Sequence, residues 1–107
     1  MKPANNAPMY AMVYAKLAEI AREHGYAMAV HGTLARDFDL ICVPWTEDPA
    51  EPQVIVDEIT SRFTLRVIDS PELKLHSRLC YTLSFGGDVF LDLSFMPRAA
   101  QPPGDGQ

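Results

Sequence analysis

Two aspartates stand two residues apart in a stretch that otherwise has the composition of a buried β-strand. The stretch is VHGTLARDFDLICV, residues 30–43, and it places Asp37 and Asp39 shortly after a turn at Gly32 and Thr33. An ionised carboxylate is costly to hold against apolar neighbours unless it is paired or bound to a cation. The pair therefore indicates either a cation-binding site or, more simply, a structural or solvated pair at a strand edge.

A third aspartate, Asp92, occurs in the apolar run VFLDLSF, residues 89–95. If the loop before this run spans residues 86–88, leucine and aromatic side chains of both flanking strands share one wholly apolar face. Asp92 then lies on the opposite face, and the period of two along a strand turns Asp37 and Asp39 away from their apolar neighbours. With the apolar faces against helices, all three carboxylates share the open face. They repel one another unless a divalent cation, Mg²⁺ or Mn²⁺, lies between them.

Three basic residues alternate in the segment KLHSR, residues 74–78. If this segment belongs to a strand, Lys74, His76 and Arg78 lie on the same open face as the aspartates. A cation site beside basic side chains that can contact phosphate is the arrangement expected for a nucleoside triphosphate. The alternative is that the basic row is the solvated face of an edge strand, where charge protects against aggregation.

Hydrophobic periodicity and turn chemistry predict the elements that position these residues. Apolar residues three and four apart predict a helix over residues 9–24. Helix-start chemistry at Asp48, Pro49 and Glu51 predicts a second helix over residues 52–63. Apolar runs predict strands over residues 26–32, 37–43, 64–69, 73–85 and 89–95. We therefore expect an α+β fold, a mixed sheet of about five strands with two helices on one face.

Several other side chains are expected to be structural. We expect Met28 in the core together with Met9 and Met12 of the first helix. Trp45 is expected to anchor a loop on the domain, and His31 to be a half-buried strand residue rather than a ligand. The sheet-facing side of the second helix is expected to carry Val56, Ile59 and Phe63, with Ile55 at its margin.

The composition is that of one globular domain. The chain has 107 residues, 48% of them hydrophobic and 21% charged. We predict a lead over residues 1–8, a single domain over residues 9–96 and a disordered tail over residues 97–107. The net charge of −5 argues against broad nucleic-acid binding, which needs a basic surface.

Cysteine usage and hydropathy bear on the compartment. Cys42 and Cys80 lie in apolar runs, which favours free thiols in a reducing compartment and leaves a disulfide as the alternative. The first residues lack the apolar core of a signal peptide, and nowhere do enough apolar residues run together to span a membrane. We expect a cytoplasmic protein with no membrane contact.

Taken together, these residues resemble a known superfamily. Gly32-Thr33, then Asp37 and Asp39, then Asp92 look like the signature of the nucleotidyltransferases that include DNA polymerase beta. In that family a strand ends in Gly-Ser or Gly-Gly, an Asp-x-Asp or Asp-x-Glu pair follows, and a third carboxylate lies on a neighbouring strand. The segments HGTLARDFDL and KLHSR look most like the small phage and prophage type. Here only three residues, 34–36, separate the turn from the first aspartate, where the family has a longer segment with a short helix.

The resemblance implies transfer of a nucleoside monophosphate from a nucleoside triphosphate to an acceptor hydroxyl, with release of pyrophosphate. The acceptor is not identified by the sequence, and protein and RNA are both open. Asp37 and Asp39 would hold two Mg²⁺ or Mn²⁺ ions, and Asp92 would complete the acceptor-side ion site and take the proton. Gly32 and Thr33 would meet the β and γ phosphates. The charge on the leaving pyrophosphate would be neutralised by Arg36, Lys74 and Arg78.

Two other interpretations stay open. The short segment between Thr33 and Arg36 favours a non-catalytic nucleotidyltransferase-like module, which binds metal, nucleotide or a partner protein. The second is a plain α+β domain with an acidic surface patch and no ligand. The three carboxylates on one face favour the enzyme.

Overall fold

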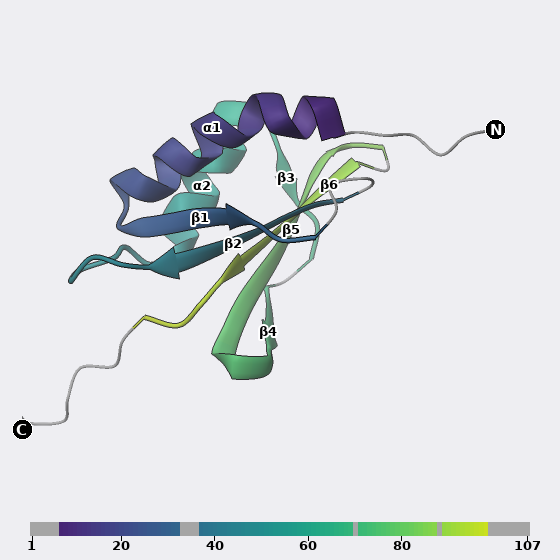
Figure 1. Cartoon of the computed structure of the whole chain (residues 1–107). Helices are drawn as coiled ribbons and strands as arrows, with labels where there is room; N and C mark the ends of the chain where they lie inside the picture. The colour runs from purple at the N-terminus through teal and green to yellow at the C-terminus, as the bar shows by residue number, and fades with distance from the viewer. Residues whose placement is uncertain (1–6, 33–36, 70, 88, 99–107) are drawn as a thin grey trace, which may run out of the picture.

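Helices α1 (Ala7–Glu23) and α2 (Pro52–Phe63) pack against the same face of a mixed β-sheet, as the sequence predicts (Figure 1). The computed structural model describes residues 7–32, 37–69, 71–87 and 89–98. Over these residues the sheet has six strands, where about five were expected. The strands are β1 (Tyr26–Val30), β2 (Phe38–Pro44), β3 (Arg66–Val67), β4 (Glu72–Lys74), β5 (Arg78–Gly86) and β6 (Val89–Phe95).

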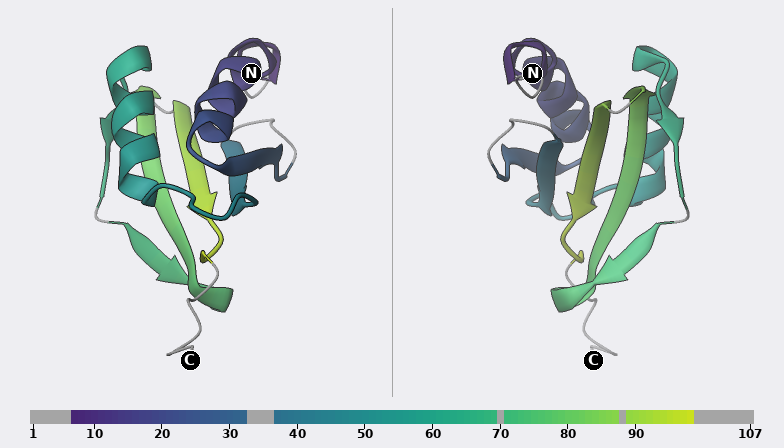
Figure 2. Two further views of the ribbon diagram at one scale, coloured as in Figure 1. Left: turned by 90° about the vertical axis from the view of Figure 1, so that its left-hand side faces the viewer. Right: turned by 90° about the vertical axis from the view of Figure 1, so that its right-hand side faces the viewer.

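The strand order places β6 in the interior of the sheet. The order is β1-β2-β6-β5-β3, and β4 also pairs with β5. β6 runs parallel to β2 on one side and antiparallel to β5 on the other. Figure 2 shows the two helices on one side of the sheet, while the opposite face carries no helix of the described chain. β2 and β6 are thus neighbours in the sheet, although they are far apart in the sequence.

The β5–β6 hairpin has the register predicted from burial. Leu83 pairs with Leu91, and both side chains are fully buried on the helix-bearing face. The predicted loop over residues 86–88 is wrong at its first residue: a β-bulge follows Ser84, and Gly86 is the last residue of β5 and pairs with Val89. Gly86 has a φ of 116°, a conformation that glycine adopts without a steric penalty. The alternation of apolar and polar residues on the two strands is therefore confirmed.

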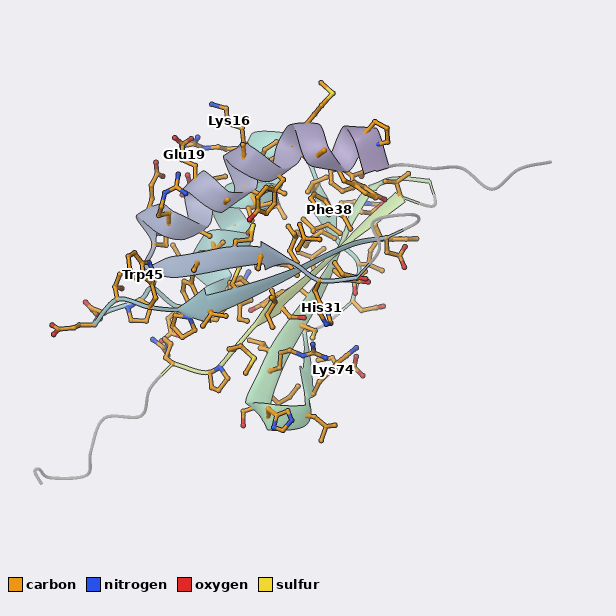
Figure 3. The ribbon with its side chains drawn as sticks, in the orientation of Figure 1. Lys16, Glu19, His31, Phe38, Trp45 and Lys74 are labelled. Atoms are coloured by element: carbon orange, nitrogen blue, oxygen red, sulfur yellow. The ribbon has the colours of Figure 1, made fainter. Side chains whose placement is uncertain are left out.

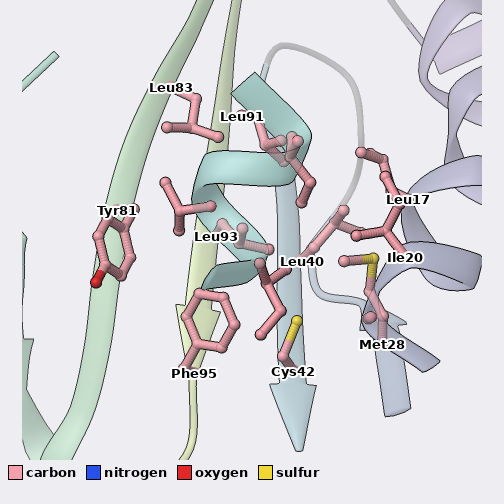
Figure 4. Close-up of a cluster of buried hydrophobic side chains, with 14 of the residues drawn as sticks. Leu17, Ile20, Met28, Leu40, Cys42, Tyr81, Leu83, Leu91, Leu93 and Phe95 are labelled. Atoms are coloured by element: carbon pink, nitrogen blue, oxygen red, sulfur yellow. The ribbon is translucent and has the colours of Figure 1, made fainter. Parts of the chain in front are cut away.

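The hydrophobic core lies between the sheet and the helices (Figure 4). Tyr10 of α1 stacks on Phe38 of β2, with ring centroids 4.6 Å apart. The prediction of Met12 in the core is wrong, because its side chain is 81% exposed, and Met9 is also exposed. α1 is rotated about its axis relative to the prediction, so that the tyrosine faces the sheet in place of the methionines. The buried members of α1 and β1 are Tyr10, Leu17, Ile20, Ala21, Tyr26 and, as predicted, Met28.

Helix α2 has the predicted bounds but a different start and face. Its N-cap is Glu51, with Pro52 in the first turn, so Asp48 is not the capping residue. Ile55 is fully buried rather than marginal, whereas Phe63 is only partly buried. The proline at the first helical position explains the sharp start, because its φ suits a helix and its missing N–H has no partner there in any case.

The run 73–85 is not one strand. β4 ends at Lys74, a short 3₁₀ turn η1 (Leu75–Ser77) follows, and β5 begins at Arg78. His76 and Ser77 have φ values of 64° and 58°, so the chain reverses through the left-handed region without a glycine. The alternating basic row is therefore wrong as a strand face: Lys74 and Arg78 oppose each other across a hairpin, and His76 lies in its turn.

The remaining structural expectations have mixed outcomes. Cys42 and Cys80 are free thiols, as favoured. Trp45 is 67% exposed and does not anchor its loop in the core, and His31 is exposed rather than half-buried. The predicted strand over residues 64–69 is reduced to the two residues of β3.

The described chain extends slightly beyond the predicted domain at both ends. α1 begins at Ala7, inside the predicted lead, and residues 97 and 98 of the predicted tail are described, whereas 99–107 lie outside the described residues. Neither α1 nor α2 is long and apolar enough to cross a membrane.

Candidate functional site

A pair of carboxylates lies at the centre of the open sheet face. In the parallel pairing of β2 and β6, Asp39 is the register partner of Asp92. Their neighbours Phe38, Leu40, Leu91 and Leu93 are all buried against the helices. Because side chains alternate along a strand, this burial turns both aspartates to the opposite face. The structure thus confirms that Asp39 and Asp92 share the open face and brings them side by side.

The two carboxyl groups interact directly. Burial raises the pKa of Asp39 to about 6, and a hydrogen bond to the Asp92 carboxyl and the charges of Asp92 and Asp37 act in the same direction. His31 opposes this shift. Two carboxylates this close form a hydrogen bond only when one of them holds a proton. Near neutral pH the pair is therefore a concentrated negative charge that a cation would relieve.

Thr82 of β5 fixes the second carboxylate of the pair. Its hydroxyl donates a hydrogen bond to Oδ1 of Asp92 at 3.2 Å, across the register pair that joins β5 to β6. Alternation along the run 73–85 predicts Thr82 on the open face, but its residue type alone indicates no role in the site. The signal was its position directly opposite Asp92 once the hairpin register was known.

Gly32 lies against the first carboxylate. Its φ is 99°, and a Cβ at this position would lie 3.0 Å from Oδ2 of Asp39. The backbone N–H of His31 donates to the Asp39 carbonyl at 2.7 Å, which continues the β1–β2 ladder up to this glycine. The backbone conformation thus favours glycine, and a Cβ here would displace the Asp39 carboxylate by a few tenths of an ångström. The sequence predicts that Gly32 and Thr33 contact phosphate. The structure places Gly32 beside the Asp39 carboxylate.

The other predicted residues of this end of the site have different outcomes. Asp37 is exposed and precedes the first residue of β2, close enough to Asp39 to raise its pKa. Thr33 and Arg36 lie outside the described residues. Of the three predicted carboxylates, the structure places Asp39 and Asp92 side by side. Asp37 lies next to this pair, outside β2.

A pocket of about 670 Å³ opens over the carboxylate pair. Lys74 and Arg78, from the β4–β5 hairpin, line the pocket that Asp39 and Asp92 also line. Figure 3 shows Phe38 on the side of the sheet that faces α1, and His31 and Lys74 on the other side. The full lining is His31, Asp39, Leu40, Asp69, Pro71, Glu72, Lys74, Arg78, Cys80, Thr82, Asp92 and Ser94.

Arg78 carries a polar atom without a partner. Its Nε is buried, and no hydrogen-bond acceptor for it is found in the described part of the chain. Among the described residues, Lys74 forms one ion pair, a long one of 3.9 Å with the exposed Glu72. A buried donor that lacks an acceptor is unfavourable by about 1–3 kcal/mol, so an anion that enters this pocket gains a partner already in place.

The carboxylates of Asp39 and Asp92 are suitable ligands for a hard divalent cation. Within residues 7–32, 37–69, 71–87 and 89–98, no group of three or more His, Cys, Asp or Glu side chains is arranged to hold a metal ion. Two adjacent carboxylates are nevertheless the ligand type that Mg²⁺ prefers, and Mg²⁺ is commonly bound by one or two carboxylates together with substrate phosphates. Asp39 and Asp92 would hold such an ion.

The arrangement of the site is therefore acidic at the sheet centre and basic along the hairpin, with one pocket between them. Models of known protein families, curated proteins and solved structures were each compared with this chain, and none of them matches it. The interpretation of the site consequently rests on its residues and their geometry.

Proposed function

We propose that this protein binds a nucleoside triphosphate together with Mg²⁺ or Mn²⁺ and transfers the nucleoside monophosphate to an acceptor hydroxyl. One observation carries the proposal: Asp39 and Asp92, paired in register on β2 and β6, line the same pocket as Lys74 and Arg78. A triphosphate with its cation needs carboxylate on one side and basic side chains on the other. The resemblance of Gly32-Thr33, Asp37, Asp39 and Asp92 to the sequence signature of nucleotidyltransferases supports the same interpretation.

Each residue has a definite part in this proposal. Arg78 and Lys74 bind the β and γ phosphates and neutralise the charge that builds up on the departing pyrophosphate. Asp92, oriented by Thr82, receives the proton of the acceptor hydroxyl. The acceptor oxygen forms a bond to the α phosphorus while the bond from that phosphorus to the bridging oxygen of the β phosphate breaks. A bound divalent cation supplies charge neutralisation and lowers the pKa of the attacking hydroxyl.

Calorimetric titration of Mg²⁺ and then of each nucleoside triphosphate tests the binding part. Arg78→Ala and Lys74→Ala should each weaken nucleotide binding by about 1.5–3 kcal/mol, the value of a hydrogen bond to a charged group. The matched control is Lys16→Ala, because Lys16 is an exposed lysine on α1, away from the pocket (Figure 3). Unchanged affinity in both pocket variants would make the two residues a solvated hairpin edge.

A thermal melt tests the cation ligands separately. Mg²⁺ or Mn²⁺ should raise the melting temperature of the unmodified chain, because only the folded state assembles the pair. Asp39→Ala should abolish this rise. An equal rise in both proteins would show that the ion binds elsewhere.

A non-catalytic nucleotide-binding module is the second candidate function. The observation that favours it is the short segment between the Gly32-Thr33 turn and Asp37, which has only three residues where the nucleotidyltransferase family has a longer segment with a short helix. Incubation of the protein with nucleoside triphosphates labelled at the α phosphate, in cell lysate, distinguishes the two. Label on an acceptor that is lost in Asp92→Asn supports the enzyme, whereas binding without transfer supports the module.

A further inference from the structure

The β4–η1–β5 hairpin extends past the helices that cover the rest of the sheet. We call residues 72–80 the hairpin arm; Figures 1 and 2 show it projecting from the end of the sheet, away from α1. Leu73 and Leu75 on this arm are 69% and 81% exposed. Leucine side chains bury apolar surface when a partner is present, so two such side chains on one short projection indicate a surface that another molecule covers.

The two faces of the arm differ in chemistry. Lys74 and Arg78 oppose each other and line the pocket of the carboxylate pair. Leu73 and Leu79 oppose each other one residue along, and therefore lie on the reverse face. The apolar face of the arm is thus independent of the nucleotide pocket and of the function proposed for it.

A groove of about 550 Å³ lies along this apolar face. One wall is Leu73, and the apolar lining continues through Leu79 and Phe95 to Met96 and Pro97. The backbone N–H of Met96 donates to the Cys42 carbonyl at 2.9 Å, which holds the chain after β6 against the sheet. The groove is therefore built from ordered backbone on both sides, and its size is within the range of pockets that hold a small ligand.

The rim opposite the arm is acidic. Glu47, Asp48 and Glu51 line the groove from the loop before α2. Arg98 pairs with Glu51 at 2.6 Å, which satisfies one of the three carboxylates. Glu47 and Asp48 are exposed and form no ion pair with any residue that the structure describes. The groove thus presents apolar surface bordered by uncompensated negative charge.

We propose that this groove binds a short peptide segment of a partner protein, in which apolar side chains are flanked by lysine or arginine. The apolar side chains of the segment fill the space between Leu73 and Met96, and its basic side chains meet Glu47 and Asp48. This charge excludes nucleic acid and anionic lipid as occupants, because both carry the same sign as the rim. A peptide with glutamate in place of lysine is excluded for the same reason.

Fluorescence anisotropy with labelled synthetic peptides tests the proposal on the full chain. The probe is a short peptide of alternating leucine and lysine, compared with a leucine–glutamate and a serine–lysine version. We expect saturable binding of the leucine–lysine peptide and at least about tenfold weaker binding of the other two. Equal binding of the serine–lysine peptide would overturn the proposal, because it would show attraction by net charge alone.

Variants of the groove complete the test. Leu73→Ser and Asp48→Lys should each weaken binding of the leucine–lysine peptide by about tenfold, and Met12→Ser should leave it unchanged. Met12 is the matched control because it is also a largely exposed apolar residue, and it lies on α1. All three side chains are exposed, so the fold should persist, and a thermal melt checks this. Unchanged binding in Leu73→Ser, or a self-association of the chain that Leu73→Ser removes, would overturn the proposal.

Discussion

Replacing Asp39 with asparagine should stabilise the protein at neutral pH and leave its stability unchanged in acid. The folded state raises the pKa of Asp39 from 3.8 to about 6, chiefly by burial and by the hydrogen bond with Asp92. Between these two values the folded protein binds a proton that the unfolded chain has released. The free energy of unfolding contributed by this group therefore falls as pH rises through that window. Below it the penalty is absent, and above it the penalty is complete.

The size of the effect follows from the shift. A change of about two pKa units corresponds to nearly 3 kcal/mol if each unit is about 1.4 kcal/mol. Asp39 is partly exposed, and solvent screening reduces the figure to about 1–1.5 kcal/mol. Asparagine keeps the shape and a hydrogen bond to Asp92 but carries no charge, so the variant should gain this amount at about pH 8 and nothing at about pH 3.5.

Urea unfolding across this pH range, with a chelator present to exclude divalent cations, measures the difference. The control is Glu19→Gln, which removes an exposed carboxylate from α1 (Figure 3). Parallel stability curves for the unmodified chain and Asp39→Asn would refute the reasoning. They would mean that the carboxylate pair is no more strained in the folded protein than in the unfolded chain.

The remaining predictions concern packing and backbone. Leu91→Ala and Leu93→Ala should each lose about 2–5 kcal/mol in urea unfolding, because both are fully buried, and partly exposed Phe90→Ala should lose less; the reverse order would place Asp92 on the helix side. Gly32→Ala should lose about 1–3 kcal/mol, since its φ of 99° strains any side chain, and should also abolish the thermal shift by Mn²⁺ through contact with the Asp39 carboxylate. Tyr14→Phe should lose about 0.5–1.5 kcal/mol with its 2.6 Å bond to the Met28 carbonyl, and an unchanged urea midpoint would contradict this.

The open-face position of the acidic pair could be predicted because it depends on local alternation. Apolar neighbours on both sides of Asp39 and Asp92 leave one direction for each carboxylate. The parallel register that sets them opposite each other could not be read in this way. It joins segments far apart in the chain, and nothing in either segment alone specifies which residue faces which.

The basic side of the site shows where alternation fails. Lys74, His76 and Arg78 have the spacing of a strand, but the chain reverses at His76 and Ser77. Neither residue is a glycine or proline, and the serine is only a weak turn signal, so the apolar and basic alternation favours a continuous strand. The face of α1 was missed for a related reason: tyrosine and methionine both satisfy a helical hydrophobic pattern, and the choice between them depends on the shape of the sheet below.

The interior position of β6 has a consequence for how the protein reaches its folded state. Among the described strands β6 comes last in the sequence, yet it joins β2 to β5, and without it the described sheet is two unconnected pieces. Contacts between distant segments form slowly, because a long loop must close before they contribute. The carboxylate pair is thus assembled only when the final strand inserts, and its mutual repulsion opposes that closing step. Divalent cations should for this reason accelerate refolding as well as stabilise the folded protein. Cation binding would then report that β6 has joined the sheet.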